Sequence, residues 1–130
     1  MRLFSTTLCA IFVTASIGLA DPIFGTWQTS QDDNGNFGHI EVSACDQNIC
    51  GVLKKSFNAE GKAIESKNTG TRIIWGMVNK GGGKYGDGKI YSPDRDKTYG
   101  SKLALNGDSL KVSGCIAFIC RDGGTWVRVK

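Results

Sequence analysis

Short runs of alternating apolar and polar residues make up most of the chain after residue 20. From His39 to Ala44 every second residue is apolar, and the run from Ser109 to Ile116 repeats the pattern. Glycine or polar turns recur roughly every eight to twelve residues, and no segment has sustained helical periodicity. The pattern predicts an all-β domain of about eight antiparallel strands.

The connections between these runs are short. Asn34-Gly35 and Asn106-Gly107 are typical of tight hairpins, and 58–70 is the longest predicted loop. Strands adjacent in sequence should therefore be neighbours in the sheet. A single sheet would expose two edges, and closing it removes both. We expect a single small antiparallel up-and-down β-barrel.

The tripeptide Gly-Thr-Trp occurs twice, at residues 25–27 and 124–126. The first copy lies on the first predicted strand and the second copy on the last. Because closure pairs these two strands, both copies should meet at one seam of the barrel.

The first twenty residues resemble a secretory signal peptide. Arg2 is their only charged residue, an apolar stretch follows, and the small residues Gly18 and Ala20 suit cleavage before Asp21. Cleavage after Ala15 is the alternative. The interruptions by Thr and Ser argue against a membrane-spanning helix. We therefore expect a signal peptide at 1–20 and a mature domain at 21–130, located in the periplasm or secreted.

The composition of residues 21–130 limits the classes of partner. These 110 residues suffice for one domain, and their net charge of +3 is scattered, since Arg2 carries the remaining unit of the +4 of the whole chain. A weak, mixed charge without a basic stripe does not favour nucleic acid. No second long apolar run follows, so no membrane span is expected after cleavage, and we expect a monomer.

Four cysteines remain after residue 20, as the pairs Cys45/Cys50 and Cys115/Cys120. An even number in a small exported domain indicates disulfides. Three pairings are open, and we favour the two local ones because each could fasten a hairpin. A zinc site is disfavoured because the apolar residues 116–119 do not suit a zinc knuckle, and the C-x-x-C redox spacing is absent.

Five short motifs follow one another along the chain after residue 20. They are Gly25-Thr26-Trp27, Gly88-Lys89-Ile90-Tyr91-Ser92-Pro93, Lys97-Thr98-Tyr99, Leu110-Lys111-Val112-Ser113-Gly114 and Thr125-Trp126-Val127-Arg128-Val129. This ordered set resembles the bacterial exported family DUF2147, a domain of unknown function, and the resemblance spans nearly the whole mature chain. The sequence departs from the family pattern at Arg95-Asp96, where Asn-Gly is frequent, and at Tyr85, where Trp is common.

A Gly-x-Trp on the first strand together with an arginine on the last is also similar to the calycin arrangement of lipocalins and fatty-acid-binding proteins. This resemblance implies a lipocalin-like barrel in which Arg128 packs over Trp27 and closes the base, through a cation–π contact. The alternative is that Trp27 simply fills the core. The resemblance concerns the fold and not the function.

Residues suited to catalysis are sparse, and we expect no enzyme, cofactor or metal site. His39 is the only histidine, and the alternation places it with Glu41 on the face opposite the core. Asp32-Asp33 lies in a turn, where such side chains bind the backbone. Asp94 and Asp96 flank a tight turn without the other ligands of a calcium loop.

Two binding functions fit a small exported barrel. In the first, the interior binds a small apolar or amphipathic ligand among Trp75, Tyr91, Tyr99 and Phe118, although small barrels can also be filled by their own side chains. In the second, the domain is an envelope protein–protein interaction module or enzyme inhibitor. That module would present the glycine-rich hairpin at 80–84 with Tyr85.

Overall fold

The computed structural model describes residues 21–129, and all of its regular elements are β-strands. The signal-peptide prediction for 1–20 lies outside the described residues. The strands are β1 (Gly25–Gln28), β2 (Phe37–Cys45), β3 (Asn48–Phe57), β4 (Ala63–Ile64), β5 (Arg72–Gly81), β6 (Lys84–Ser92), β7 (Lys97–Asn106), β8 (Ser109–Ile116) and β9 (Ile119–Arg128).

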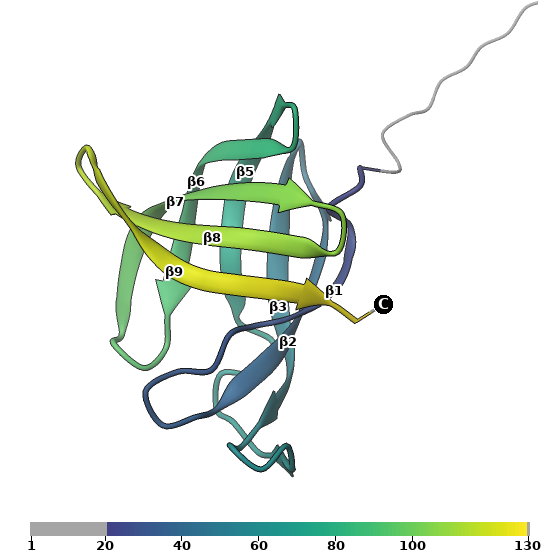
Figure 1. The fold of residues 1–130 in the computed structure, drawn as a ribbon, viewed down its shortest axis with the longest axis vertical. Coiled ribbons are helices and arrows are strands. Elements are labelled where there is room, and N and C mark those ends of the chain that lie inside the picture. The colour runs from purple at the N-terminus through teal and green to yellow at the C-terminus, as the bar shows by residue number, and fades with distance from the viewer. Residues whose placement is uncertain (1–20, 130) are drawn as a thin grey trace, which may run out of the picture.

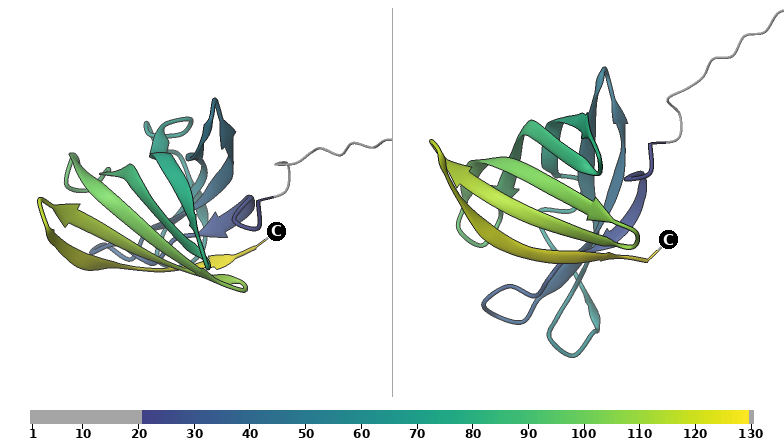
Figure 2. Two further views of the ribbon diagram at one scale, coloured as in Figure 1. Left: turned by 90° about the horizontal axis from the view of Figure 1, so that it is seen from above. Right: turned by 45° about the horizontal axis from the view of Figure 1, so that its top comes forward.

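Eight of these strands close into an antiparallel barrel (Figures 1 and 2). Each strand pairs with its neighbour in sequence, except that β4 is a two-residue addition to β3, which pairs onward with β5. The last strand returns to the first: Trp27 of β1 lies opposite Arg128 of β9, and Gln28 lies opposite Val127. The predicted closed up-and-down barrel is confirmed.

The barrel is packed at one end, where the chain enters. Ile23 is fully buried there, and the indole Nε1 of Trp27 donates to the Ile23 carbonyl at 2.9 Å. The core consists mainly of inward residues of the strands, which are Trp27, Ile40, Val42, Ile49, Leu53, Ile73, Ile74, Met77, Tyr85, Leu103, Leu110, Val112 and Trp126. Because β1 begins only at Gly25, Ile23 reaches this core from a turn that precedes the strand.

The Asp21 side chain holds that turn against the far side of the barrel. Its carboxylate accepts hydrogen bonds from the Tyr85 hydroxyl at 2.6 Å, from Asn79 Nδ2 at 3.0 Å and from the Ile23 amide at 3.0 Å. Burial raises the pKa of Asp21, but these donors together outweigh it, so the pKa lies below its ordinary value. The turn therefore depends on an ionised Asp21.

The two Gly-Thr-Trp copies share one local geometry on the paired strands β1 and β9. Gly25 has φ +139° and Gly124 has φ +103°, which are values that favour glycine. Two residues later Trp27 is fully buried and Trp126 is 4% exposed. Trp126 lies opposite Leu110 of β8, which is also buried.

Both disulfides fasten hairpins. Cys45–Cys50 links β2 to β3, and Cys115–Cys120 links β8 to β9. The favoured local pairing is therefore the one found. Each bridge ties strands that are already adjacent, so barrel closure rests on β1–β9 pairing and on the core.

Candidate ligand-binding cavity

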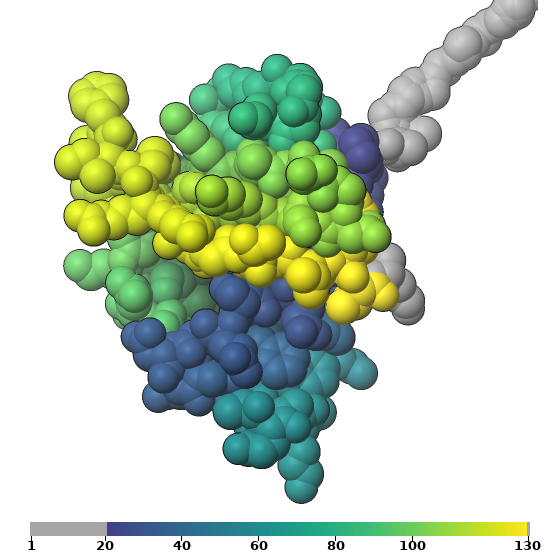
Figure 3. All heavy atoms as spheres, viewed as in Figure 1, coloured from purple at the N-terminus to yellow at the C-terminus, as the bar shows by residue number. Residues whose placement is uncertain are grey.

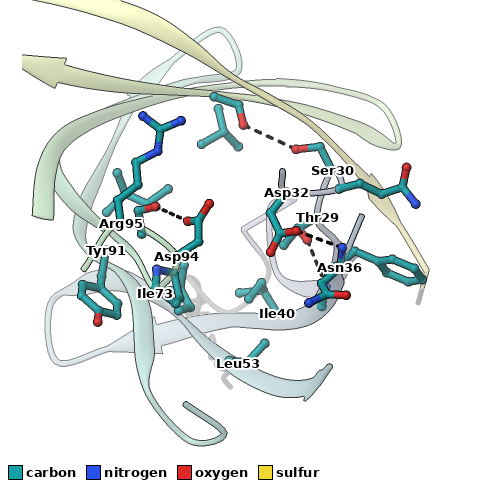
Figure 4. A pocket seen from close by; sticks show the side chains of 18 of the residues that line it. Thr29, Ser30, Asp32, Asn36, Ile40, Leu53, Ile73, Tyr91, Asp94 and Arg95 are labelled. Atoms are coloured by element: carbon teal, nitrogen blue, oxygen red, sulfur yellow. Dashed lines mark hydrogen bonds between the residues drawn. The ribbon is translucent and has the colours of Figure 1, made fainter. Parts of the chain in front are cut away.

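The end of the barrel opposite the Ile23 turn is hollow. A cavity of about 1090 Å³ lies among the residues after β1, the 64–68 segment, the β6–β7 turn and the β8–β9 hairpin (Figure 4). It reaches down to the middle of the barrel, where Ile40, Val112 and Trp126 begin the packed core. The barrel is thus a cup with a filled base.

The lower wall of the cavity is apolar. Leu53 and Ile73 stand beside Ile40 in Figure 4, and all three are buried members of the core. Ile90 and Trp126 continue this wall on β6 and β9. This lower wall, which is the apolar floor of the cavity, can pack against a hydrocarbon or aromatic group.

The upper wall is polar and comes from loops. Ser30 and Asp32 face Asp94 and Arg95 of the β6–β7 turn across the opening (Figure 4). Asp32 Oδ1 accepts from the Asn34 and Asn36 amides, both at 2.9 Å, which confirms that this carboxylate binds its own turn. The charged lining residues are Asp32, Asp33, Glu65, Asp94, Asp122, Arg95 and Arg121, an excess of carboxylates.

Arg128 fixes the seam below this cavity. Its Cζ lies 4.4 Å from the centroid of the Trp27 ring. The guanidinium donates to the carbonyls of Phe24 at 2.9 Å and Pro22 at 2.7 Å, and to Asp108 Oδ1 at 2.9 Å. One side chain therefore ties β9 to the entry turn, to β1 and to the β7–β8 turn. This is the contact expected from the calycin resemblance.

Comparison with protein families finds a match over residues 25–128 to a family described as "Uncharacterized protein conserved in bacteria (DUF2147)". The chain belongs to this family. A comparison with curated proteins finds no match. Among solved structures, the domain is similar to the protein HP1028 of the human pathogen Helicobacter pylori, described as a member of the lipocalin family. The TM-score is 0.64 and the identity 18%, over 83% of each chain. At this identity the likeness shows the fold alone.

At both positions where this DUF2147 domain departs from the family pattern, the residue present makes a side-chain hydrogen bond. Tyr85, which stands in place of a common Trp, is buried and uses its hydroxyl to bind Asp21. Burial, reinforced by that hydrogen bond, raises the pKa of Tyr85. Asp96 of the β6–β7 turn has φ +51° and accepts from the Tyr91 hydroxyl at 2.8 Å. Because Tyr85 is buried, the predicted presentation of this residue by a projecting hairpin is wrong.

The four aromatic residues predicted for the interior of the DUF2147 barrel have different positions. Tyr99 lines the cavity, and Tyr91 lies at its edge with its ring turned away from the centre (Figure 4). Trp75 is half-buried and does not line the cavity, because it lies opposite the exposed Lys89 on the outer side. Phe118 is fully exposed at the turn between β8 and β9, so its interior placement is wrong.

His39 is not a fully solvated residue. Its Nε2 lies 3.3 Å from Gln28 Oε1, and its ring packs against Phe57 with centroids 4.7 Å apart. Burial, with a contribution from the Lys55 charge, lowers its pKa. Phe57 also stacks on Phe37, which borders the cavity. Sequence reasoning missed this cluster because its members come from three strands, β1, β2 and β3, and meet only through strand pairing.

Sequence reasoning also missed the loop residues of the upper wall. Ile64, Ser66 and Asn68 come from the predicted long loop. Ser30 lies in the segment after β1, and Arg121 lies in the β8–β9 hairpin. No local pattern in the sequence indicates that these segments meet. In the part of the chain that the structure describes, no group of three or more His, Cys, Asp or Glu side chains is placed to hold a metal ion. Residues 21–129 also contain no helix capable of spanning a membrane.

Proposed function

We propose that this domain is an exported binding protein whose cavity takes one small amphipathic molecule. The observation that carries the proposal is the division of the cavity into an apolar floor and a polar upper wall. Binding sites for small molecules usually combine a mostly apolar lining with a few placed polar groups, in volumes of roughly 300 to 1,000 Å³. The cavity of about 1090 Å³ is slightly larger than the upper limit of that range.

The lining residues also favour an orientation for the ligand. An apolar chain or ring would rest on Ile40, Leu53 and Ile73, where little water needs to be retained. The polar group would lie level with Ser30 and Arg95. Since five carboxylates and two guanidinium groups line the cavity, a cationic or neutral polar group suits the opening better than an anionic one.

Binding is favoured over catalysis by the state of the reactive side chains. All four cysteines after residue 20 form disulfides, so no thiolate nucleophile is supplied by them. His39 contacts Gln28 and Phe57, and it is not among the residues that line the cavity. We therefore propose a non-enzymatic role.

Export is supported by two observations. Disulfides form and persist in oxidising compartments, and this small domain has two. The family to which the chain belongs is bacterial. Together with the signal-like residues 1–20, these observations support a periplasmic or secreted location.

The proposal is tested by titrating the purified protein with dansylated alkylamines that keep a second, free and cationic amine, and in parallel with dansylated fatty acids. We expect saturable binding, with a blue-shifted dansyl emission, and tighter binding of the amine series. Native mass spectrometry should show one probe per protein. Emission that rises without saturation for both series, with no bound mass, would overturn the proposal.

A further inference from the structure

The β8–β9 hairpin ends in an exposed apolar tip beside the cavity. The tip, residues 116–119, contains Phe118 at 100% exposure, Ile116 at 68% and Ile119 at 65%. It projects beyond the body of the barrel (Figures 1 and 3), and the Cys115–Cys120 disulfide lies at its base. An exposed apolar group of this kind usually marks a contact with a protein or a membrane.

The β2–β3 hairpin shows that this fold does not require an apolar tip. It too is closed by two cysteines five positions apart, Cys45 and Cys50, but its turn is Asp46-Gln47, followed by Asn48. Its two paired strands continue into the barrel as β8 and β9 do. A polar turn is therefore sufficient for a disulfide-closed hairpin in this protein.

One residue of the apolar tip, Ala117, is also unfavourable for the backbone conformation that the turn requires. Ala117 has φ +55°, in the left-handed region where glycine, asparagine and aspartate are the usual residues. The equivalent Asp46 has the same φ and is a residue that tolerates it. Ala117 opposes the local conformational preference, and Phe118 beside it is not buried by any part of its own chain. This combination favours an external contact as the reason for the apolar residues.

The size and shape of the tip favour a lipid surface over a second copy of the chain. Its three large side chains offer on the order of 400 Å² of apolar surface, about half of the roughly 800 Å² per partner that a stable interface buries. Two exposed valines, Val127 of β9 and Val129 directly after it, lie at the opposite end of the strand from the tip. A narrow projection that ends in an aromatic ring can enter the headgroup region of a bilayer without a matching groove.

The charge of the hairpin is compatible with phospholipid. Between Asp108 and Asp122 the chain carries two cations, Lys111 and Arg121, and no carboxylate. Arg121 is exposed and lies directly after the disulfide. Asp122, which directly follows Arg121, is the one carboxylate between Ser109 and Arg128, and Lys111 and Arg121 outnumber it. The hairpin therefore has no net negative charge that would repel it from a neutral or an anionic headgroup layer.

We propose that the β8–β9 tip is a membrane-docking element that inserts Phe118, Ile116 and Ile119 into the headgroup region of a phospholipid bilayer. Ile116 and Ile119 also line the cavity, so the apolar surface runs from the tip to the opening of the cup. Docking would place that opening next to the bilayer. The docking itself requires only the tip and is independent of whether the cavity is filled.

Flotation of the oxidised protein with liposomes tests this proposal. Vesicles of phosphatidylcholine alone, and of phosphatidylcholine with an equal part of phosphatidylglycerol, should both carry the wild-type protein upward. Phe118→Ser should lower the partition coefficient by about tenfold or more. Val127→Ser, at a residue of the same strand that is 45% exposed, should change it little. Thermal unfolding of both variants verifies that they fold.

Insertion at the tip is measured directly with a tryptophan reporter. Vesicles should shift the emission of Phe118→Trp to the blue, and lipids brominated on the upper acyl chain should quench it, whereas Val127→Trp should show neither effect. Equal flotation of wild type and Phe118→Ser, or no flotation of the wild type, would overturn the proposal. A dimer that Phe118→Ser dissociates would also overturn it, in favour of a second copy as the occupant. None of these outcomes changes the dansyl titration in solution, so the two proposals fail separately.

Discussion

Two side chains near the packed end of the barrel, Arg128 and Asp21, each make three hydrogen bonds. Arg128 joins β9 to the entry turn and to the β7–β8 turn, and Asp21 joins the same entry turn to Tyr85 and Asn79. The turn between them positions Ile23 over the core. At the scale of residues, the closed base of the cup therefore depends on polar contacts that flank a buried isoleucine.

Replacing Arg128 by lysine separates the stabilising effect of the guanidinium's three hydrogen bonds from that of its positive charge. Arg128→Lys keeps the charge but cannot reach Phe24, Pro22 and Asp108 together. We expect a loss of about 2 kcal/mol in the unfolding free energy, measured with urea. Arg121→Lys, at an exposed arginine of the same strand, should change it by less than about 0.5 kcal/mol. Equal effects would show that only the charge matters.

Asp21 should make stability depend on pH in the acid range. Its pKa in the folded protein is lowered from 3.8, so the unfolded chain takes up the proton first as pH falls. The stabilisation is present above pH 3.8 and is lost as pH falls through the folded-state pKa. Unfolding free energies of wild type and Asp21→Asn should therefore differ near neutral pH and converge in acid. A constant difference at all pH values would contradict this, and Asp33→Asn serves as an exposed control.

At the scale of elements, alternation predicted the strands because a period of two follows directly from the pleat. It failed where the period is broken. The register between β3 and β5 shifts between Ile74 and Met77, the stretch that contains Trp75. Trp75 faces outward, opposite the exposed Lys89, although Ile73 and Ile74 before it are both buried. Phe118 was assigned to the interior for its apolarity, but the two-residue turn places it at a tip. The position of a bulge or turn depends on how two strands pair, and the sequence of one strand alone does not determine that register.

The paired strands β1 and β9 also explain why the second Gly-Thr-Trp begins with glycine. A Cβ at Gly124, where φ is +103°, would lie 2.8 Å from the Ser30 Cβ. Gly107 also has positive φ, at +62°, but has open space around it. Gly124→Ala should cost roughly 3 kcal/mol, from backbone strain and overpacking, against about 1 kcal/mol for Gly107→Ala. Equal costs in urea denaturation would show that the contact with Ser30 is unimportant.

At the scale of the whole molecule, the fold was more predictable than the site. Short connections and the need to pair both sheet edges led to a closed barrel, and the terminal positions of Trp27 and Arg128 located its seam. The cavity could not be predicted, because its polar wall comes from four loops that are far apart in sequence. Closure of the barrel depends only on the order in which the strands pair. How much of the interior is filled depends on the side chains of all eight strands together.

The central claim is that the cavity, and not another surface, takes the ligand, and a pair of glycine variants tests it most directly. Gly114 lines the cavity, and a Cβ there would make only ordinary contacts with Tyr99, the nearest at 3.6 Å. Gly100 lies one strand away, opposite Cys115, and does not line it. The measurement is the dissociation constant of a dansylated alkylamine for Gly114→Phe and Gly100→Phe, with thermal unfolding to verify that both variants fold. We expect binding to weaken by about tenfold or more in Gly114→Phe alone, because the ring occupies the ligand's volume. Unchanged binding by a folded Gly114→Phe would contradict it.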